Sequence, residues 1–224
     1  MRIYLASAAA AALLLAAGAA SAQSAEVSFN ATVTSDYVFR GYSQTDQNPA
    51  FQIGADLTAG IFYAGAWASN VDFGDDTKAE FDVYGGVRGE AAGFDLDLGL
   101  VGYFYADEPT GADYNFYEVK AAASRAIGPA TLGLAVYYSP DFFGVDETAT
   151  YVELNGEWAV TDKLSLSGAA GEQYLDVNDD YSTWNIGVGY ALNDALGLDL
   201  RYHDTDVAGA LSEQRFVASL SLGF

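Results

Sequence analysis

The sequence contains no cysteine, one methionine, one histidine and only nine lysine and arginine residues. Without cysteine, the chain has no disulfide framework, no thiol nucleophile and no cysteine metal site. The nine basic residues stand against 31 acidic ones, so the formal net charge is −22. No basic stripe is available to neutralise phosphates, and nucleic acid is therefore not an expected partner.

Long hydrophobic runs are also missing after the N-terminal segment, where no stretch reaches 18 uninterrupted apolar residues. This excludes a helical membrane protein but not a β-barrel, whose strands need only about ten alternating residues each. The N-terminal segment has Arg2, an apolar run from Ile3 to Ala20 and a small-x-small site at Ala20–Ala22. We expect a signal peptide over residues 1–22, cleaved near Ala22, with a retained membrane anchor as the alternative. Residues 23–224 then form one domain.

Catalytic signatures are sparse. The single histidine, His203, would need a serine within hydrogen-bond distance and a third orienting group, and nothing local marks Ser182 or Ser212. The acidic runs at 72–76 and 177–180 lack the ligand spacing of an EF-hand, and no phosphate-binding glycine loop is present. The sequence therefore predicts no enzyme, no catalytic residue, no cofactor and no metal.

What the chain does contain is 24 glycines, 16 tyrosines and 13 phenylalanines, a composition typical of an all-β protein with tight turns. Apolar and polar residues alternate with a period of two over twelve candidate strands. The clearest are Glu26–Phe39 and Arg215–Phe224, which ends on an aromatic residue. The third strand, near Ile61–Val71, and the ninth, near Leu164 and Leu166, are the weakest, so ten strands are an alternative.

The connections between these strands alternate strictly in length. Tight turns are expected at Ala59–Gly60, Glu90–Gly93, Ile127–Pro129, Thr161–Asp162 and Asn193–Asp194. Longer acidic loops are expected at Gly41–Pro49, Ala106–Asp113, Pro140–Ala149 and Asp206–Glu213. An even strand number with short turns at one rim and long loops at the other predicts an antiparallel up-and-down transmembrane β-barrel of about twelve strands, with both termini at the periplasmic rim. A soluble sandwich has no reason to sort its loops in this way.

Aromatic residues near the strand ends support the same fold, because membrane barrels carry aromatic girdles at both interfaces. The alternative is that tyrosine and phenylalanine simply favour strands. The residues assigned to the outer face are Tyr37, Phe39, Tyr63, Phe104, Tyr117, Tyr138, Tyr190 and Tyr202.

The opposite, polar strand faces would line the lumen. A twelve-stranded barrel lies between filled eight-stranded barrels and open porins, so we expect a narrow lumen partly occupied by long side chains. Two interpretations stay open: a diffusion pore whose charges select solutes, or a plug in which Glu118 with Lys120 and Asp199 with Arg201 neutralise each other. The candidate pore-lining residues are Asp36, Arg40, Asp82, Arg88, Glu118, Lys120, Asp199, Arg201 and Arg215.

Several stretches resemble the TorF-like porins of Gram-negative bacteria. They are SDYVFRGYSQTD (35–46), WASNVDF (67–73), EFDVYGG (80–86), WNIGVGY (184–190) and ASLSLGF (218–224). The resemblance spans essentially the whole mature chain and implies an outer-membrane barrel without an established substrate or catalytic residues. It also implies that Asp36, Arg40 and Gln44 lie at the outer mouth of the first hairpin.

The sequence thus predicts an outer-membrane, porin-like channel for passive diffusion of small polar solutes. A non-conducting barrel, structural or adhesive through its acidic loops, is the alternative. Expected partners are outer-membrane lipid, the solutes and the barrel-insertion machinery, for which Phe224 is the expected assembly signal. The sequence indicates no oligomeric state.

Overall fold

Twelve antiparallel strands close into a barrel in the computed structural model, which describes residues 25–144 and 147–224. The predicted signal peptide and cleavage site lie outside the described residues. The strands of the barrel are β1 (Glu26–Thr34), β4 (Ala50–Ala59), β5 (Phe62–Asn70), β6 (Ala79–Ala91), β7 (Phe94–Ala106), β8 (Phe116–Ile127), β9 (Ala130–Ser139), β10 (Ala149–Ala159), β11 (Leu164–Leu175), β12 (Tyr181–Ala191), β13 (Leu196–Thr205) and β14 (Arg215–Gly223).

Each strand pairs with its neighbour in sequence, and β1 closes the ring by pairing with β14. The alternation of the sequence explains this arrangement, because successive side chains of a strand point to opposite faces of the sheet. In β7, Leu96, Leu98 and Leu100 are exposed on the outside, whereas Asp97 and Tyr103 turn inward. The apolar row therefore faces out and the polar row faces in, the reverse of a soluble protein.

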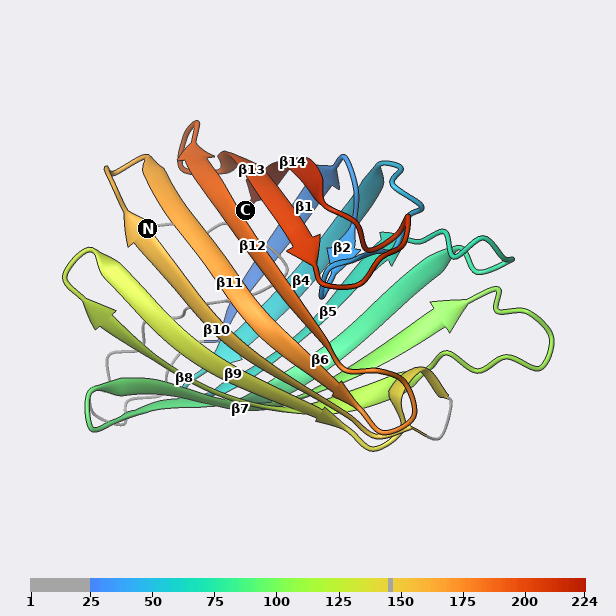
Figure 1. Ribbon diagram of the computed structural model, residues 1–224. Helices are drawn as coiled ribbons and strands as arrows, with labels where there is room; N and C mark the ends of the chain where they lie inside the picture. Colours follow the sequence, from blue (N-terminus) through green and yellow to red (C-terminus); the bar gives the residue numbers. More distant parts are fainter. Residues whose placement is uncertain (1–24, 145–146) are drawn as a thin grey trace.

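The connections are sorted by length, as the sequence predicts. Turns of two to four residues join one set of strand ends, at 60–61, 92–93, 128–129, 160–163 and 192–195. Longer loops join the other set, at 35–49, 71–78, 107–115, 140–148, 176–180 and 206–214. Figure 1 shows the tight turns toward the left and the long loops toward the right. The one helix in the described ranges, η1 (Phe142–Gly144), is far too short to cross a membrane.

The first strand is shorter than predicted. β1 ends at Thr34, and residues 35–49 turn inward to form a separate hairpin of β2 (Val38–Phe39) and β3 (Tyr42–Ser43). The placement of Tyr37 and Phe39 in an outer girdle is therefore wrong: Tyr37 is buried against Trp67, and Phe39 packs on Tyr103. A period of two cannot reveal where a strand leaves the sheet, because a hairpin keeps the same alternation.

Tyr63 is the third outer-face assignment that is wrong. In β5 the small residues Ala64 and Ala66 face outward, while Tyr63 and Trp67 point into the barrel. The remaining predicted girdle residues follow the outward rows of their strands: Phe104, Tyr117, Tyr138, Tyr190 and Tyr202. The weak ninth strand is present as β11, which removes the ten-strand alternative.

The last residue completes the closure of the barrel. The backbone N–H of Phe29 donates to the carbonyl of Phe224 at 2.7 Å, and the N–H of Phe224 donates to Phe29 at 3.0 Å. Their rings stack with centroids 5.7 Å apart, and Phe224 is 68% exposed. The exposure leaves this aromatic accessible at the rim of the tight turns while its backbone pairs with β1.

Deleting Phe224 is expected to lower the yield of inserted barrel. It removes two backbone hydrogen bonds at the seam, each contributing about 1 kcal/mol, together with the exposed terminal aromatic. The measurement is the amount of heat-modifiable protein in the outer-membrane fraction, with Phe224→Leu as a variant that keeps the backbone pairing. Normal yield of the deletion variant would contradict the assembly role.

Candidate functional site

The inward hairpin crosses the lumen just below the rim of the long loops. Its chain leaves β1, and its tip reaches β8, which lies on the far side of the ring in the strand order. Figure 1 shows β2 inside the ring of strands. This segment of fifteen residues, 35–49, thus lies between two parts of the barrel interior. The part on the side of the long loops is called the outer vestibule below, and the part on the side of the tight turns is called the inner lumen.

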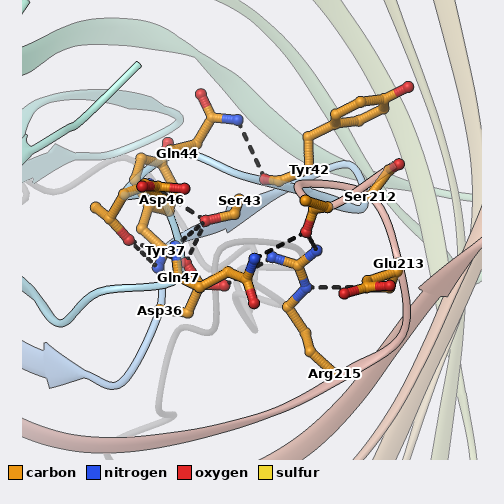
Figure 2. A network of polar contacts seen from close by, with 12 residues as sticks. Asp36, Tyr37, Tyr42, Ser43, Gln44, Asp46, Gln47, Ser212, Glu213 and Arg215 are labelled. Atoms are coloured by element: carbon orange, nitrogen blue, oxygen red, sulfur yellow. Dashed lines mark hydrogen bonds and ion pairs between the residues drawn. The ribbon is translucent and has the colours of Figure 1, made fainter. Parts of the chain in front are cut away.

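The base of the hairpin is held by Asp36. Its carboxylate accepts hydrogen bonds from Ser43 Oγ at 2.7 Å and Thr45 Oγ1 at 2.9 Å, and pairs with Arg215 Nη1 at 3.0 Å (Figure 2). The Arg215 guanidinium also donates to the carbonyls of Glu213 and Ala210. This buried network ties the hairpin to β14 and to the loop that precedes it.

The tip is a two-residue turn of Arg40 and Gly41, both with positive φ, 45° and 89°. Such a turn matches the twist of a hairpin and requires residues that tolerate the left-handed region. A Cβ on Gly41 would lie 2.2 Å from Thr205 Cγ2 and 2.7 Å from Thr183 Oγ1. Only glycine fits between the turn and the wall formed by β12 and β13.

Arg40 clamps the tip to the opposite wall. Nη1 and Nη2 each donate to one Glu118 oxygen at 2.7 Å, and Nη1 also donates to Gln173 Oε1 at 3.1 Å. The side chains of Arg40 and Glu118 are 6% and 1% exposed. Tyr103 donates to Glu118 at 3.0 Å, and the guanidinium lies 4.4 Å from the ring centroid of Tyr151. Burial lowers the pKa of Arg40, but Glu118 more than offsets this and raises it above the ordinary value, so the clamp is ionic.

A second cluster, centred on Asp97, lies nearer the rim of the tight turns. Asp97 pairs with Arg88 at 3.1 Å and with Lys120 at 3.0 Å, and it accepts a hydrogen bond from Tyr63 at 2.7 Å. The Arg88 guanidinium also lies 3.8 Å from the ring centroid of Tyr63. One carboxylate therefore pairs with two cations, from β6 and β8, which leaves this cluster with one positive charge in excess.

A third cluster surrounds Arg201 on β13. It pairs with Asp199 at 3.1 Å and donates to Asn185 at 2.6 Å and to Ser167 at 2.7 Å. The guanidinium lies over Gly187, where a Cβ would approach it to 2.8 Å. The side chain is thus spread along the wall over three adjacent strands, β13, β12 and β11.

Several inward carboxylates make no ion pair among the described residues. Three of them accept a tyrosine hydroxyl: Asp56 from Tyr84, Glu80 from Tyr37 and Glu153 from Tyr151. Asp82 lies on the same face of β6 as Glu80, and Asp95 and Glu157 lie on the inward faces of β7 and β10. All five inward cations, in contrast, are paired with carboxylates. The inner face therefore carries an excess of negative charge.

A sequence comparison supplies the family. The family model of Gcw_chp, described as a bacterial protein of unknown function, matches residues 16–221. The chain belongs to the Gcw_chp family. A search of the curated proteins gives no match for this family member.

Solved structures with a similar fold are outer-membrane channels. The KdgM porin is 8% identical, with a TM-score of 0.59 over 88% of this chain and 98% of the porin. KdgM in complex with disordered oligogalacturonate is 7% identical, with a TM-score of 0.62 over 90% and 99%. An outer-membrane channel from Pseudomonas putida F1 is 10% identical, with a TM-score of 0.53 over 92% and 96%. At these identities, the similarity establishes a porin-type barrel fold for the Gcw_chp protein.

The nine residues predicted to line the lumen all take part in the inward network or face it. Asp199 and Arg201 pair with each other, as one interpretation of the sequence held. The proposed pairing of Glu118 with Lys120 is wrong, because Glu118 binds Arg40 and Lys120 binds Asp97. Residues two apart on a strand share a face, but partners on a neighbouring strand or on the inward hairpin can come closer.

Two features escaped the sequence interpretation of this Gcw_chp protein. One is the inward hairpin, for which the Arg40–Gly41 dipeptide between strand-forming pairs was an available signal. The other is the role of Asp97, which became visible only when β6, β7 and β8 were placed in register.

His203 makes no contact with the serines considered for catalysis: Ser182 donates to Glu172, and Ser212 to the carbonyls of Val207 and Gly209. Within the described residues, no cluster of three or more potential metal ligands occurs.

Proposed function

We propose that this protein is an outer-membrane channel through which small polar solutes diffuse passively, with the inward hairpin as its constriction. The observation that carries the proposal is the ionic attachment of that hairpin, which spans the lumen and is clamped by Arg40 and Glu118. A purely structural plug could be held by apolar packing alone, whereas this one leaves charged and hydroxyl groups around the passage. The TorF-like resemblance of the sequence agrees with this function.

The charge of the inner face favours neutral and cationic solutes over polyanions. The inward arginines and lysine are all paired, and Asp56, Asp95, Glu153 and Glu157 have no cationic partner among the described residues. The KdgM porin forms a complex with oligogalacturonate, a polyanion. A similar fold with excess inward carboxylates would repel such a solute, so we infer a different solute class here.

The channel would reach the outer membrane after removal of residues 1–22 and insertion guided by Phe224. Its apolar outer rows would contact outer-membrane lipid directly. An enzymatic role is not part of the proposal, because the lone histidine, His203, has no hydroxyl nucleophile bonded to it in the described part of the chain.

Planar-bilayer recording on the refolded mature protein tests the proposal. We expect small conductance steps, with folding verified by a shift in gel position between unboiled and boiled samples. Absence of steps above background, from protein that shows the gel shift, would refute conduction. It would favour the second candidate, a non-conducting barrel that acts through its acidic loops, for which the occluding hairpin is the supporting observation.

Alanine substitution of Arg88, Arg201 or Arg215 is expected to move the reversal potential in a salt gradient toward cation selectivity. Each substitution removes one positive charge from the lumen. Asp199 and Asp36 are left without a cation when Arg201 or Arg215 is removed, whereas Asp97 keeps Lys120 when Arg88 is removed. Arg125→Ala is the matched control, because Arg125 is exposed near the tight-turn rim and makes no ion pair among the described residues. Unchanged reversal potentials in all three variants would contradict a role for these arginines in selectivity.

A further inference from the structure

The outer vestibule is a cavity of about 790 Å³ above the inward hairpin. Phe39, Tyr42 and Gln44 of the hairpin form its floor, and the long loops form its walls. The volume falls within the range of about 300–1,000 Å³ that is typical of sites for small molecules. Any solute that enters the proposed channel from outside would meet this cavity first.

Two groups of aromatic rings line the cavity. On one side, Phe73, Tyr114 and Phe143 contact one another with centroids 5.9 to 6.4 Å apart. On another, Tyr42 of the hairpin meets Tyr181 of β12 edge to face at 5.2 Å. Aromatic faces carry negative electrostatic potential and attract organic cations.

Carboxylates accompany both aromatic groups. Asp75 accepts a hydrogen bond from Tyr114 on the first side, whereas Asp179, Asp180 and Asp206 line the second. Hydrogen bonds from Thr77 lower the pKa of Asp75, so this group is charged at neutral pH. The pKa of Tyr42 is raised by burial and then by the negative charge of Asp206, which places that charge close to the ring.

Positive charge is scarce near the same surface, where Lys78 Nζ donates to the backbone carbonyl of Asp75 at 2.9 Å. No lysine, arginine or histidine of the described residues lines the cavity, and none of its four aspartates forms an ion pair within the described ranges. Aromatic faces together with carboxylates that form no ion pair are the chemistry that binds ammonium groups. A site for neutral sugars does not need four charged side chains. A site for acidic sugars would be lined by lysine or arginine.

We propose that the vestibule is a binding site for small organic cations, such as quaternary ammonium compounds. The ammonium group sits in the angle formed by the nearly perpendicular rings of Tyr42 and Tyr181, and Asp206 and Asp180 compensate its charge. This inference rests on the proposed channel function and names the solute class of its outer site. Ligands would gather above the hairpin before they pass the constriction.

Calorimetric titration of the refolded protein in detergent tests the site without any need for conductance. The probes are choline, its uncharged isostere 3,3-dimethylbutan-1-ol, and galacturonate, each at low ionic strength. We expect choline to bind at least about tenfold more tightly than the isostere, because only the cation gains the ring and carboxylate interactions. Galacturonate should give no binding signal, and added salt should weaken the binding of choline.

Asp206→Asn is the informative variant, since asparagine keeps the acceptor for the Ser182 N–H and removes only the charge. It should weaken choline binding severalfold and leave the isostere unaffected. Asp194→Asn, in the tight turn at the opposite rim, is the matched control and should change neither.

Equal affinity for choline and its isostere, preference for galacturonate, or no signal with choline up to the order of 10 mM would each overturn the site. Different results refute the channel proposal and the binding-site proposal. Choline binding without conductance would refute only the channel, and conductance without choline binding would refute only the site.

Discussion

Arg40→Ala is expected to raise the single-channel conductance severalfold. The substitution removes the bidentate contact with Glu118 at 2.7 Å and leaves that carboxylate buried without a cation. Breaking a buried ion pair in this way costs about 3–5 kcal/mol. Phe39 and Tyr42 still pack on Tyr103 and Tyr181, but without the ion pair we expect the tip to move away from β8 and the constriction to widen.

Two further variants show whether the effect comes from the hairpin itself. Gly41→Ala keeps the ion pair but forces a Cβ toward Thr205 and strains the positive φ of the turn, so it should also raise the conductance. Arg125→Ala removes an arginine that lies outside the hairpin contacts and should leave the conductance unchanged. Wild-type conductance in Arg40→Ala, from protein that still shows the heat-dependent gel shift, would exclude the hairpin as the constriction.

Asp97→Asn is expected to produce the largest shift in ion selectivity, toward anions. Asp97 pairs with both Arg88 and Lys120, at 3.1 and 3.0 Å, so its neutralisation leaves both cations facing the lumen without a carboxylate. Asparagine preserves the shape of the side chain and can still accept the hydrogen bond from Tyr63. The reversal potential in a salt gradient measures the shift.

A second substitution in the same cluster tests the cause. Asp97→Asn combined with Lys120→Met removes one cation with the carboxylate, and the reversal potential should return most of the way to the wild-type value. Asp162→Asn, in an exposed tight turn outside the lumen, should cause no shift. If Asp97→Asn leaves the selectivity unchanged, the Asp97 cluster lies off the conduction path.

The wall of the barrel could be predicted from the sequence because it depends on local rules. Alternation in segments such as Phe94–Ala106 fixes which side chains face lipid, and turns such as 92–93 fix which strands are neighbours. Even the closing contact of Phe224 with β1 follows from antiparallel order and strand number. The inward direction of Asp97, Arg201 and Glu118 follows from the same period of two.

The interior could not be predicted in the same way, because its contacts join residues far apart in the chain. Arg40 meets Glu118 and Gln173 across 78 and 133 residues, and Asp36 meets Arg215 across 179. The alternation in Tyr37 and Phe39 fitted a continuing strand as well as a hairpin. The packing and the ion pairs inside the closed barrel decide between a continuing strand and a hairpin.

The sequence by itself determined the class of the fold and, for most strands, which side chains face outward, because both follow from periodicity and turn chemistry within a few residues. It left ten strands open as an alternative to twelve. The tertiary structure alone decided that residues 35–49 cross the lumen, which carboxylate compensates which cation, and that aromatic rings and aspartates from separate loops meet in one vestibule. Those outcomes depend on ring closure, which brings distant segments together and leaves buried charges no partner except one another.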